Sequence, residues 1–167
     1  MDYRALIRDI PDYPKPGVVF KDLTGIWRDA NAHRQSAKDI ADHYRNAGIT
    51  KVVAAEARGF VTGSLVAAEL GAGFVPARKP GKLPWERISE KYELEYGQDS
   101  LEMHSDAIIP GDVVLLVDDL LATGGTLSAA ARLAGRLGGK VYGAGAIVCL
   151  DFLEPKLDIP VFALVRY

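Results

Sequence analysis

Val113–Thr126, which reads Val-Val-Leu-Leu-Val-Asp-Asp-Leu-Leu-Ala-Thr-Gly-Gly-Thr, is the stretch from which the fold of this chain can be worked out. Its first five residues are apolar without polar alternation, which is typical of a parallel strand buried on both faces. Two carboxylates, a short loop and then an alanine-rich segment with good helix propensity follow. The stretch therefore predicts a strand, a loop and a helix, in that order.

The loop Ala122–Thr126 is suited to holding a phosphate group. Backbone amides at the start of a helix are unpaired, the helix dipole is positive there, and glycine lets the backbone close around a ligand. The hydroxyls of Thr123 and Thr126 could donate further hydrogen bonds to a phosphomonoester. A tight turn in which Thr126 caps the helix is the structural alternative.

The acidic pair favours a ligand. Asp118 and Asp119 stand at the carboxyl end of the strand, where adjacent carboxylates repel each other in partly desolvated surroundings. A fold keeps such a pair only with compensating donors or cations. Sugar hydroxyls and a divalent cation are the compensation that this loop predicts.

Composition bounds the class of protein. The 167 residues suit one domain over 1–167, and we expect no second domain because no Pro/Gly/Ser-rich linker divides the chain. The net charge of −2 argues against broad nucleic-acid binding. The three histidines show no metal-ligand spacing, so we expect any metal to arrive with a substrate.

Location and redox chemistry follow from the same sequence. The first residues carry charges of both signs, and no apolar run approaches the length of a membrane span. We therefore expect a cytoplasmic protein with no membrane contact. Cys149 is the only cysteine and follows Ile147 and Val148, so we expect a buried core thiol and not a nucleophile.

Strand and helix patterns alternate along the chain. We expect helices over 1–12, 31–47, 60–70 and 127–137, and strands over 51–55, 73–77, 113–117, 141–150 and 161–165. Residues 13–22 form a proline-rich approach and an extended piece. This order indicates an α/β fold with a doubly wound, mainly parallel sheet flanked by helices.

Two segments depart from this alternation. Residues 1–30 predict a small N-terminal hood. Residues 80–106 form a long excursion between strands, which we expect to be a flexible lid: a ribbon strand ending at Gly97 pairs back across a turn at Gly97–Asp99 with 100–104. Loops at the carboxyl edge of a parallel sheet lie together, so Arg58 and Asp118 are expected to be neighbours.

The 113–126 stretch closely resembles the phosphoribosyl pyrophosphate signature of the type I phosphoribosyltransferases. With further segments included, nearly the whole chain is similar to the adenine phosphoribosyltransferases of that family. The segments that carry the resemblance, in the order and rough spacing of the family, are 14–22, 56–60, 78–84, 94–97 and 117–126. The resemblance implies transfer of ribose 5-phosphate from phosphoribosyl pyrophosphate to adenine, giving AMP and pyrophosphate, with Mg²⁺ as cofactor and a homodimer as the assembly.

The resemblance also implies roles for individual residues. Asp118 and Asp119 would face the ribose hydroxyls, and the loop Ala122, Thr123, Gly124, Gly125 and Thr126 would hold the 5′-phosphate. Arg58 and Lys79 match positions that contact pyrophosphate, and Lys82 is a weaker candidate. Without the resemblance, the cations at 78–82 are better explained as a solvated face than as counter-charges of a ligand.

The base site is implied by the hood. Phe20 matches an aromatic that packs on the purine, Leu150 would line the other side, and the backbone of Val19 and Lys21 would read the polar edge of adenine. By sequence alone Phe20 is a core residue. Glu95 matches a lid carboxylate that assists at the purine nitrogens, and its alternative is an exposed strand residue.

The chain departs from its relatives at one position, and one peptide bond is expected to be unusual. Lys21 stands where many relatives have arginine, so its effect on the hood is open. The family tends to have a non-proline cis peptide before the pyrophosphate arginine, and we therefore expect one at Ala57–Arg58.

Three other functions compete with adenine transfer. A phosphoribosyltransferase for hypoxanthine, guanine or xanthine would share the ribose site and differ in hood and lid. A non-catalytic sensor of phosphoribosyl pyrophosphate would share the fold, although such regulators usually add a DNA-binding domain. A P-loop hydrolase is excluded because no Gly-x-x-x-x-Gly-Lys-Ser/Thr sequence follows a strand.

Overall fold

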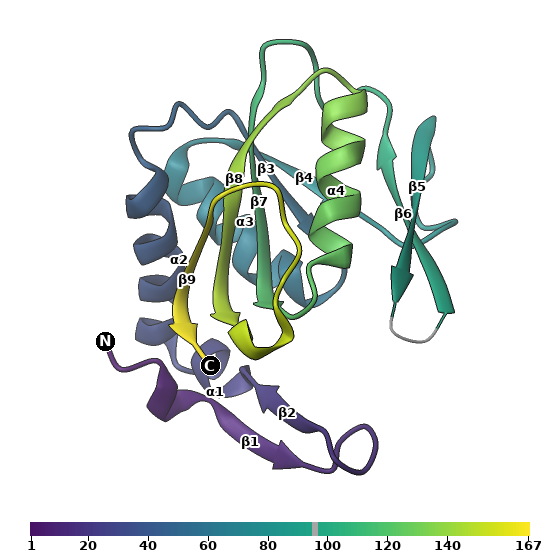
Figure 1. Ribbon diagram of the computed structural model, residues 1–167. Coiled ribbons are helices and arrows are strands. Elements are labelled where there is room, and N and C mark those ends of the chain that lie inside the picture. Colours follow the sequence, from purple (N-terminus) through teal and green to yellow (C-terminus); the bar gives the residue numbers. More distant parts are fainter. Residues whose placement is uncertain (95–96) are drawn as a thin grey trace.

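The computed structural model describes the backbone of residues 1–94 and 97–167, and side chains outside 93–98 (Figure 1). The α-helices are α1 (Thr24–Arg28), α2 (Ala30–Tyr44), α3 (Arg58–Leu70) and α4 (Gly125–Arg136), with 3₁₀ turns η1 (Arg4–Leu6) and η2 (Asp151–Leu153). The strands are β1 (Arg8–Pro11), β2 (Val19–Asp22), β3 (Lys51–Ala55), β4 (Gly73–Ala77), β5 (Arg87–Leu94), β6 (Gly97–His104), β7 (Val113–Leu121), β8 (Lys140–Cys149) and β9 (Val161–Arg166).

A five-stranded parallel sheet forms the centre of the molecule. Its order is β4-β3-β7-β8-β9, and every neighbouring pair within it is parallel. The chain runs outward from β3 to β4 and then crosses back to β7, so the order reverses between β3 and β7. Such a switch point opens a crevice at the carboxyl ends of the two strands. The predicted doubly wound α/β fold is confirmed.

Helices cover both faces of this sheet. In β7, Leu115 and Val117 pack into the apolar cluster beneath α2 and α3, whereas Val114 and Leu116 pack into the cluster beneath α4. All four side chains are fully buried. Successive residues of a strand point to opposite faces, so a strand covered on both sides needs an unbroken apolar run. This accounts for the sequence at 113–117.

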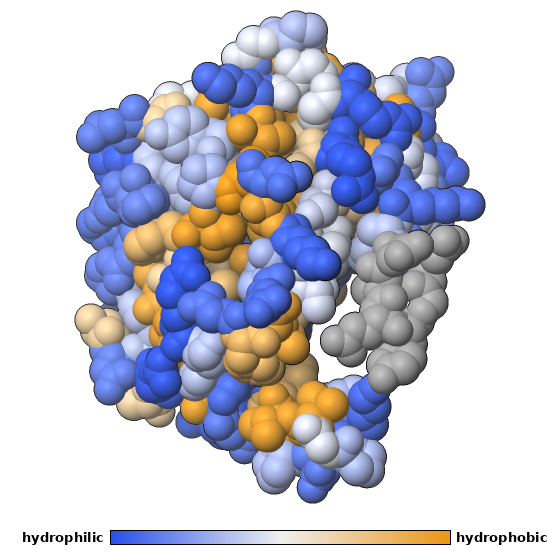
Figure 2. Space-filling view, in the orientation of Figure 1, coloured by the Kyte–Doolittle hydropathy of each residue, from blue (hydrophilic) through white to orange (hydrophobic). Residues whose placement is uncertain are grey.

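Two small antiparallel sheets flank the central one. The β1–β2 hairpin lies at the bottom of Figure 1, below the carboxyl ends of the strands, and the β5–β6 ribbon lies beside α4. Arg132 and Arg136 of α4 pair with Glu90 of β5 at 2.6 and 3.2 Å. In Figure 2 apolar side chains gather at the lower end of the molecule, over the hairpin. Among the described helices, none is both long and apolar enough for a membrane span.

The N-terminal segment differs from its prediction. Residues 1–12 are not one helix, because only Arg4–Leu6 is helical and Arg8–Pro11 pairs with Val19–Asp22. Asp12 and Gly17 adopt positive φ, and the Asp12 carboxylate accepts a 2.8 Å hydrogen bond from the amide of Gly17. This closed turn reverses the chain, and an extended hairpin then outcompetes the helical pattern.

Two predicted element boundaries were also wrong, one in the β5–β6 ribbon and one at the end of β7. The predicted turn at 97–99 belongs to β6, where Gly97 and Asp99 face Leu94 and Tyr92 across the ribbon. Side-chain contacts of Asp99, described below, hold it in that register. Strand β7 also continues past the acidic pair to Leu121, because β8 pairs with it as far as Cys149.

The cis peptide lies one bond before its predicted place. The Glu56–Ala57 bond is cis, and the Ala57–Arg58 bond is not. Arg58 is the first residue of α3 and Ala57 already has helical dihedral angles. The predicted bond thus joins two residues of a regular helical start, which requires a trans peptide.

Candidate active site

The site is built where the loops after β3 and β7 meet at the switch point. The first turn of α3 lies directly against the acidic pair of β7. A Cβ atom on Gly59 would stand 2.8 Å from Oδ1 of Asp118, which is closer than such atoms pack. Glycine at this position therefore lets α3 begin beside Asp118, and the expected proximity of Arg58 and Asp118 is confirmed.

Asp119 is buried and faces Arg58. Its side chain is 2% exposed, and Oδ2 lies 3.2 Å from Nε of Arg58. The contact is an ion pair without hydrogen-bond geometry. Among the described residues Oδ2 therefore has no hydrogen-bond partner. A buried carboxylate oxygen in this state is costly unless a donor reaches it. A ligand hydroxyl at this point would supply that donor.

The two carboxyls perturb each other. Desolvation raises the pKa of Asp118 well above its usual range, and the charge of Asp119 raises it further. Desolvation likewise raises the pKa of Asp119, although the charge of Arg58 opposes this. The amide of Asp119 donates a 2.9 Å hydrogen bond to Oδ1 of Asp118. The pair therefore gains from any ligand that brings donors or positive charge.

The loop after β7 has the form of an anion cradle. Gly124 is the N-cap of α4, has φ of +89°, and no side chain caps the helix. The alternative in which Thr126 caps the helix is therefore wrong. A side chain at Gly124 would meet the carbonyl of Lys156 at 3.0 Å, so backbone alone fits there. A recess of about 170 Å³ opens above it, lined by Asp118 and residues 120–127.

A second polar recess joins the acidic pair to the cations. Its volume is about 270 Å³, and among its lining residues are Glu56, Arg58, Lys79, Tyr92, Asp118, Asp119 and Thr126. Lys79 reaches it from the segment after β4. Lys82 is exposed and does not line this recess. The structure thus brings together Arg58 and Lys79 but not Lys82.

A third, more apolar recess lies under the hood. Its volume is about 430 Å³, and its walls are Val18, Val19, Phe20, Lys21, Arg58, Leu120, Ala122, Thr123, Leu150 and Leu153. All four residues expected to bind the base are in this set. The ring of Phe20 is half-buried, and the guanidinium of Arg58 lies 5.3 Å from its centroid. The aromatic ring of Phe20 and the apolar side chain of Leu150 are wall groups of the kind that suit a flat aromatic ligand.

The side chain of Lys21 is engaged by residues of its own protein. Its ammonium donates to both carboxylate oxygens of Asp9, at 2.7 and 2.8 Å, and lies 3.9 Å from the centroid of the Tyr167 ring. The side chain is therefore held between β1 and the segment after β9. Only the backbone of Lys21 remains to face a ligand.

Three further predictions concern Glu95, Cys149 and metal binding. Glu95 lies outside the described residues. Cys149 is buried and free, and burial beside Asp151 raises its pKa to about 11, so the predicted core thiol is confirmed. Among the described residues no group of three or more His, Cys, Asp or Glu could hold a metal ion.

Several site residues were missed from sequence. Glu56 accepts hydrogen bonds from the amide of Lys79 and, at 3.1 Å, from the guanidinium of Arg78. The pKa of Glu56 is lowered by these bonds, against the opposing effect of desolvation. Tyr92 and Leu153 also line the recesses. Only Glu56 carried a signal, since it precedes Arg58 in the segment at a strand end.

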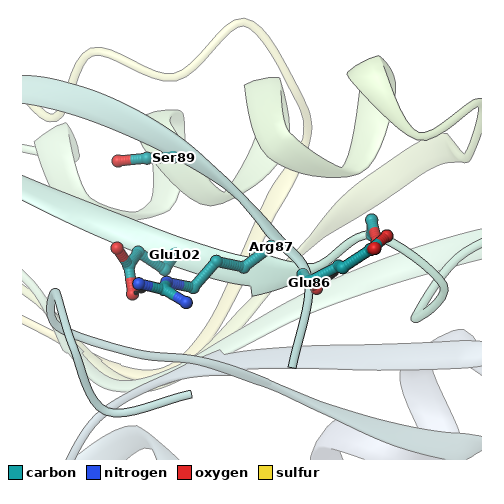
Figure 3. Close-up of a pocket in the computed structure, with 5 residues that line it drawn as sticks. Glu86, Arg87, Ser89 and Glu102 are labelled. Carbon is teal, nitrogen blue, oxygen red and sulfur yellow. Dashed lines mark hydrogen bonds and ion pairs between the residues drawn. The ribbon is translucent and has the colours of Figure 1, made fainter. Parts of the chain in front are cut away.

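Another recess lies on the β5–β6 ribbon. It measures about 490 Å³ and is lined by Glu86, Arg87, Ser89, Glu102 and Ser105. Figure 3 shows the Arg87 side chain extended toward Glu102, and its Nε lies 2.9 Å from the carboxylate. Arg87 is thus neutralised by a nearly buried partner. This recess offers a phosphate no uncompensated cation from its described lining.

Comparison with known proteins gives a consistent result. The phosphoribosyl transferase domain family matches residues 28–159. The adenine phosphoribosyltransferase of Pectobacterium carotovorum is 60% identical over 144 residues, which cover 86% of this chain and 78% of that protein.

Solved structures agree. The adenine phosphoribosyltransferase of Thermoanaerobacter pseudethanolicus superposes with a TM-score of 0.96 at 45% identity, over 99% of this chain and 98% of that one. The Saccharomyces cerevisiae enzyme, solved in complex with an imino-altritol bisphosphate and adenine, gives 0.91 at 36% identity, over 98% and 96% of the two chains.

Proposed function

The chain belongs to the phosphoribosyltransferase family, and within it to the adenine phosphoribosyltransferases, and we propose that it makes AMP for purine salvage. In this reaction the bond between C1′ of phosphoribosyl pyrophosphate and the pyrophosphate oxygen breaks. A bond from C1′ to N9 of adenine forms, the N9 proton is lost, and pyrophosphate leaves.

One observation carries the proposal. The polar recess of the acidic pair and the apolar recess of the hood share Arg58, Leu120 and Ala122. A sugar held by Asp118 and Asp119 would thus present its anomeric carbon to a flat base lying on Phe20. Adjacent sites for a polyanionic sugar and a purine are what an in-line transfer between them needs.

The sugar end is assigned by charge and geometry. The unpartnered Oδ2 of Asp119 and the carboxylate of Asp118 would accept hydrogen bonds from the ribose hydroxyls. The 5′-phosphate would lie on the loop Ala122–Thr126, against the unpaired amides at the start of α4. Positive charge develops on the sugar as pyrophosphate departs, and the nearby carboxylates stabilise it.

The leaving group needs cations. Arg58 and Lys79 line the polar recess and would hold the pyrophosphate. We propose that Mg²⁺ is bound with the substrate through pyrophosphate and ribose oxygens, keeping several of its waters. The ion would offset the charge of the leaving group.

The base is selected by backbone atoms of β2. The carbonyl and amide groups at Val19 and Lys21 would read the polar edge of adenine, with Phe20 and Leu150 on its two faces. A carbonyl acceptor facing the amino group of adenine rejects a 6-oxo purine, because two acceptors would then meet without a donor. The side chain of Lys21 is held by Asp9, so lysine in place of arginine leaves this recognition intact.

Glu95 is proposed to assist the base from the lid. We further propose that residues 1–30 and 80–106 act as hood and lid of one domain. Replacing Glu95 with glutamine should lower turnover far more than binding of phosphoribosyl pyrophosphate. Equal losses in turnover and in binding would contradict this role for Glu95.

The test is pyrophosphate release with Mg²⁺ and phosphoribosyl pyrophosphate, offering adenine, hypoxanthine, guanine and xanthine separately. Turnover with adenine is the expected result. Preference for an oxo-purine would leave the sugar site standing but overturn the assignment at Val19–Lys21. Tight binding of phosphoribosyl pyrophosphate without turnover would indicate a sensor.

The surroundings of the enzyme follow by analogy. We propose that it works in the cytoplasm and, by analogy with its family, as a homodimer. Sedimentation of the purified chain tests the assembly.

A further inference from the structure

Lys79, which is proposed to hold pyrophosphate, is already engaged by a carboxylate of the ribbon. Its ammonium pairs with Asp99 of β6 and donates a 2.9 Å hydrogen bond to the hydroxyl of Tyr92 on β5. The Tyr92 hydroxyl in turn donates to Asp99 at 3.2 Å. The ribbon therefore places an anion and a hydroxyl on the same cation that the leaving group requires.

A bound polyanion would compete with Asp99 for Lys79. The Lys79–Tyr92 contact lies at the recess lined by Arg58 and the acidic pair. The hydrogen bond and charge of Lys79 lower the pKa of Asp99, so this carboxylate is ionised at neutral pH. A pyrophosphate that reached Lys79 would meet the negative charge of Asp99 at close range, and like charges there repel. The two anions therefore compete for Lys79.

The fold decides which part of the ribbon can move. Leu101 and Met103 of β6 are fully buried in the core, and the Arg78 amide donates a 2.9 Å hydrogen bond to the carbonyl of Glu102. Those residues anchor the inner half of β6. Asp99 lies beyond this anchor and is partly exposed. Lys79, by contrast, is fixed at its backbone, where its amide donates to Glu56.

We propose that Asp99 is a latch that occupies Lys79 in the ligand-free protein, and that the pyrophosphate group of the substrate displaces it. Displacement would release the Asp99 side chain from Lys79, while Leu101 and Met103 keep the inner part of β6 in the core. Binding of the sugar substrate is thereby coupled to the position of the ribbon. This inference rests on the proposed function, since it takes pyrophosphate as the ligand of Lys79.

The test is the binding affinity of the Asp99→Asn variant, measured by calorimetry with Mg²⁺ and without adenine. Loss of one partly exposed ion pair to Lys79 should tighten phosphoribosyl pyrophosphate and pyrophosphate by about three- to tenfold. Ribose 5-phosphate, which lacks the pyrophosphate, should bind both proteins equally. A gain of affinity confined to two ligands is not a result that damage to the fold produces.

Glu90→Gln is the matched control. It removes a ribbon carboxylate that pairs with Arg132 and Arg136 but does not contact Lys79. It should leave the affinity for phosphoribosyl pyrophosphate within about twofold of the wild type. Equal tightening in both variants would mean that loosening of the ribbon, and not release of Lys79, is responsible, and would overturn the latch.

Two further outcomes separate the latch from the proposed function. Unchanged or weaker pyrophosphate binding in Asp99→Asn, with normal binding by the wild type, would overturn the latch alone. Failure of the wild type to bind phosphoribosyl pyrophosphate would overturn both. Amide exchange by NMR at Tyr92 and Ser100 supplies a second readout, because saturating pyrophosphate should accelerate it in the wild type and Asp99→Asn should show the faster rate without ligand.

Discussion

Nε of Arg58 lies 3.2 Å from Oδ2 of Asp119, and these two groups join the start of α3 to the carboxyl end of β7 across the switch point of the sheet. The arginine side chain is 43% exposed and the aspartate 2%, so the cation can turn toward a ligand while the anion cannot leave. The ion pair therefore holds the acidic residue ready and keeps the basic one available.

Arg58→Gln should lose both stability and activity. Loss of the guanidinium leaves Asp119 buried without its counter-charge, which should cost about 1–2 kcal/mol after allowance for the exposure of Arg58. The pKa of Asp119 would rise further, so the loss should vanish below the folded pKa of Asp119 in the wild type and grow as the pH rises through it. Urea unfolding at several pH values measures it. A loss that does not change with pH would contradict this explanation.

Asp118→Asn should be more stable than the wild type but much less active. The raised pKa of Asp118 means that its ionisation opposes folding, so wild-type stability falls as the pH rises from the unfolded pKa through the folded one. Asparagine removes this loss, and Tm at pH 7 should rise by about 2–4 °C for each kcal/mol relieved. Turnover should fall by about 100-fold.

Asp112→Asn is the control of opposite sign. Hydrogen bonds from the Ile109 amide and the Thr50 hydroxyl lower the pKa of Asp112. Its charge therefore stabilises the fold above the unfolded pKa, and this contribution is lost as the pH falls through the folded pKa. The variant should have a lower Tm than the wild type at pH 7. A lower Tm for Asp118→Asn as well would show that ionisation of Asp118 does not destabilise the fold.

Gly59→Ala should lower activity through Asp118. The added Cβ would stand 2.8 Å from Oδ1, so the carboxylate has to shift. We expect kcat/KM to fall by about tenfold or more with a small change in Tm. Gly63→Ala, on the same helix, instead places its Cβ 2.6 Å from that of Ala54 in the core. It should lower Tm while leaving turnover at low temperature near that of the wild type; the reverse ranking would refute this placement.

Phe20→Ala should weaken the base site alone. Removing the ring takes away the apolar wall on which the purine is proposed to lie, so KM for adenine should rise by about tenfold. KM for phosphoribosyl pyrophosphate should stay within about twofold, because its groups lie on the far side of Arg58. Trp85→Ala removes an exposed aromatic that lines none of the site recesses and serves as the control. An equal rise in both KM values would remove Phe20 from the base site.

The central strands and the position of the anion loop could be predicted because both depend on local patterns. The apolar run of β7, the glycines after it and the helix that follows are read directly from 113–136. The proximity of Arg58 and Asp118 followed from topology, since both stand at carboxyl ends of parallel strands.

What could not be predicted depends on contacts distant in sequence. The hairpin at 8–22 is fixed by the turn around Asp12 and Gly17, which overrides the helical spacing of Leu6, Ile7 and Ile10. The engagement of Lys79 by Asp99 requires the ribbon register, and no local pattern encodes it. Lys21 could be noticed as unusual, but its pairing with Asp9 appears only when β1 and β2 are side by side.

The most direct measurement of the central claim is a competition in one tube. Equal concentrations of adenine and hypoxanthine are offered to the protein with Mg²⁺ and limiting phosphoribosyl pyrophosphate, and AMP and IMP are separated and quantified. We expect the protein to form AMP with at most traces of IMP. We expect no product from an Asp118→Asn, Asp119→Asn double variant. Comparable AMP and IMP, or full activity in the double variant, would contradict the central claim.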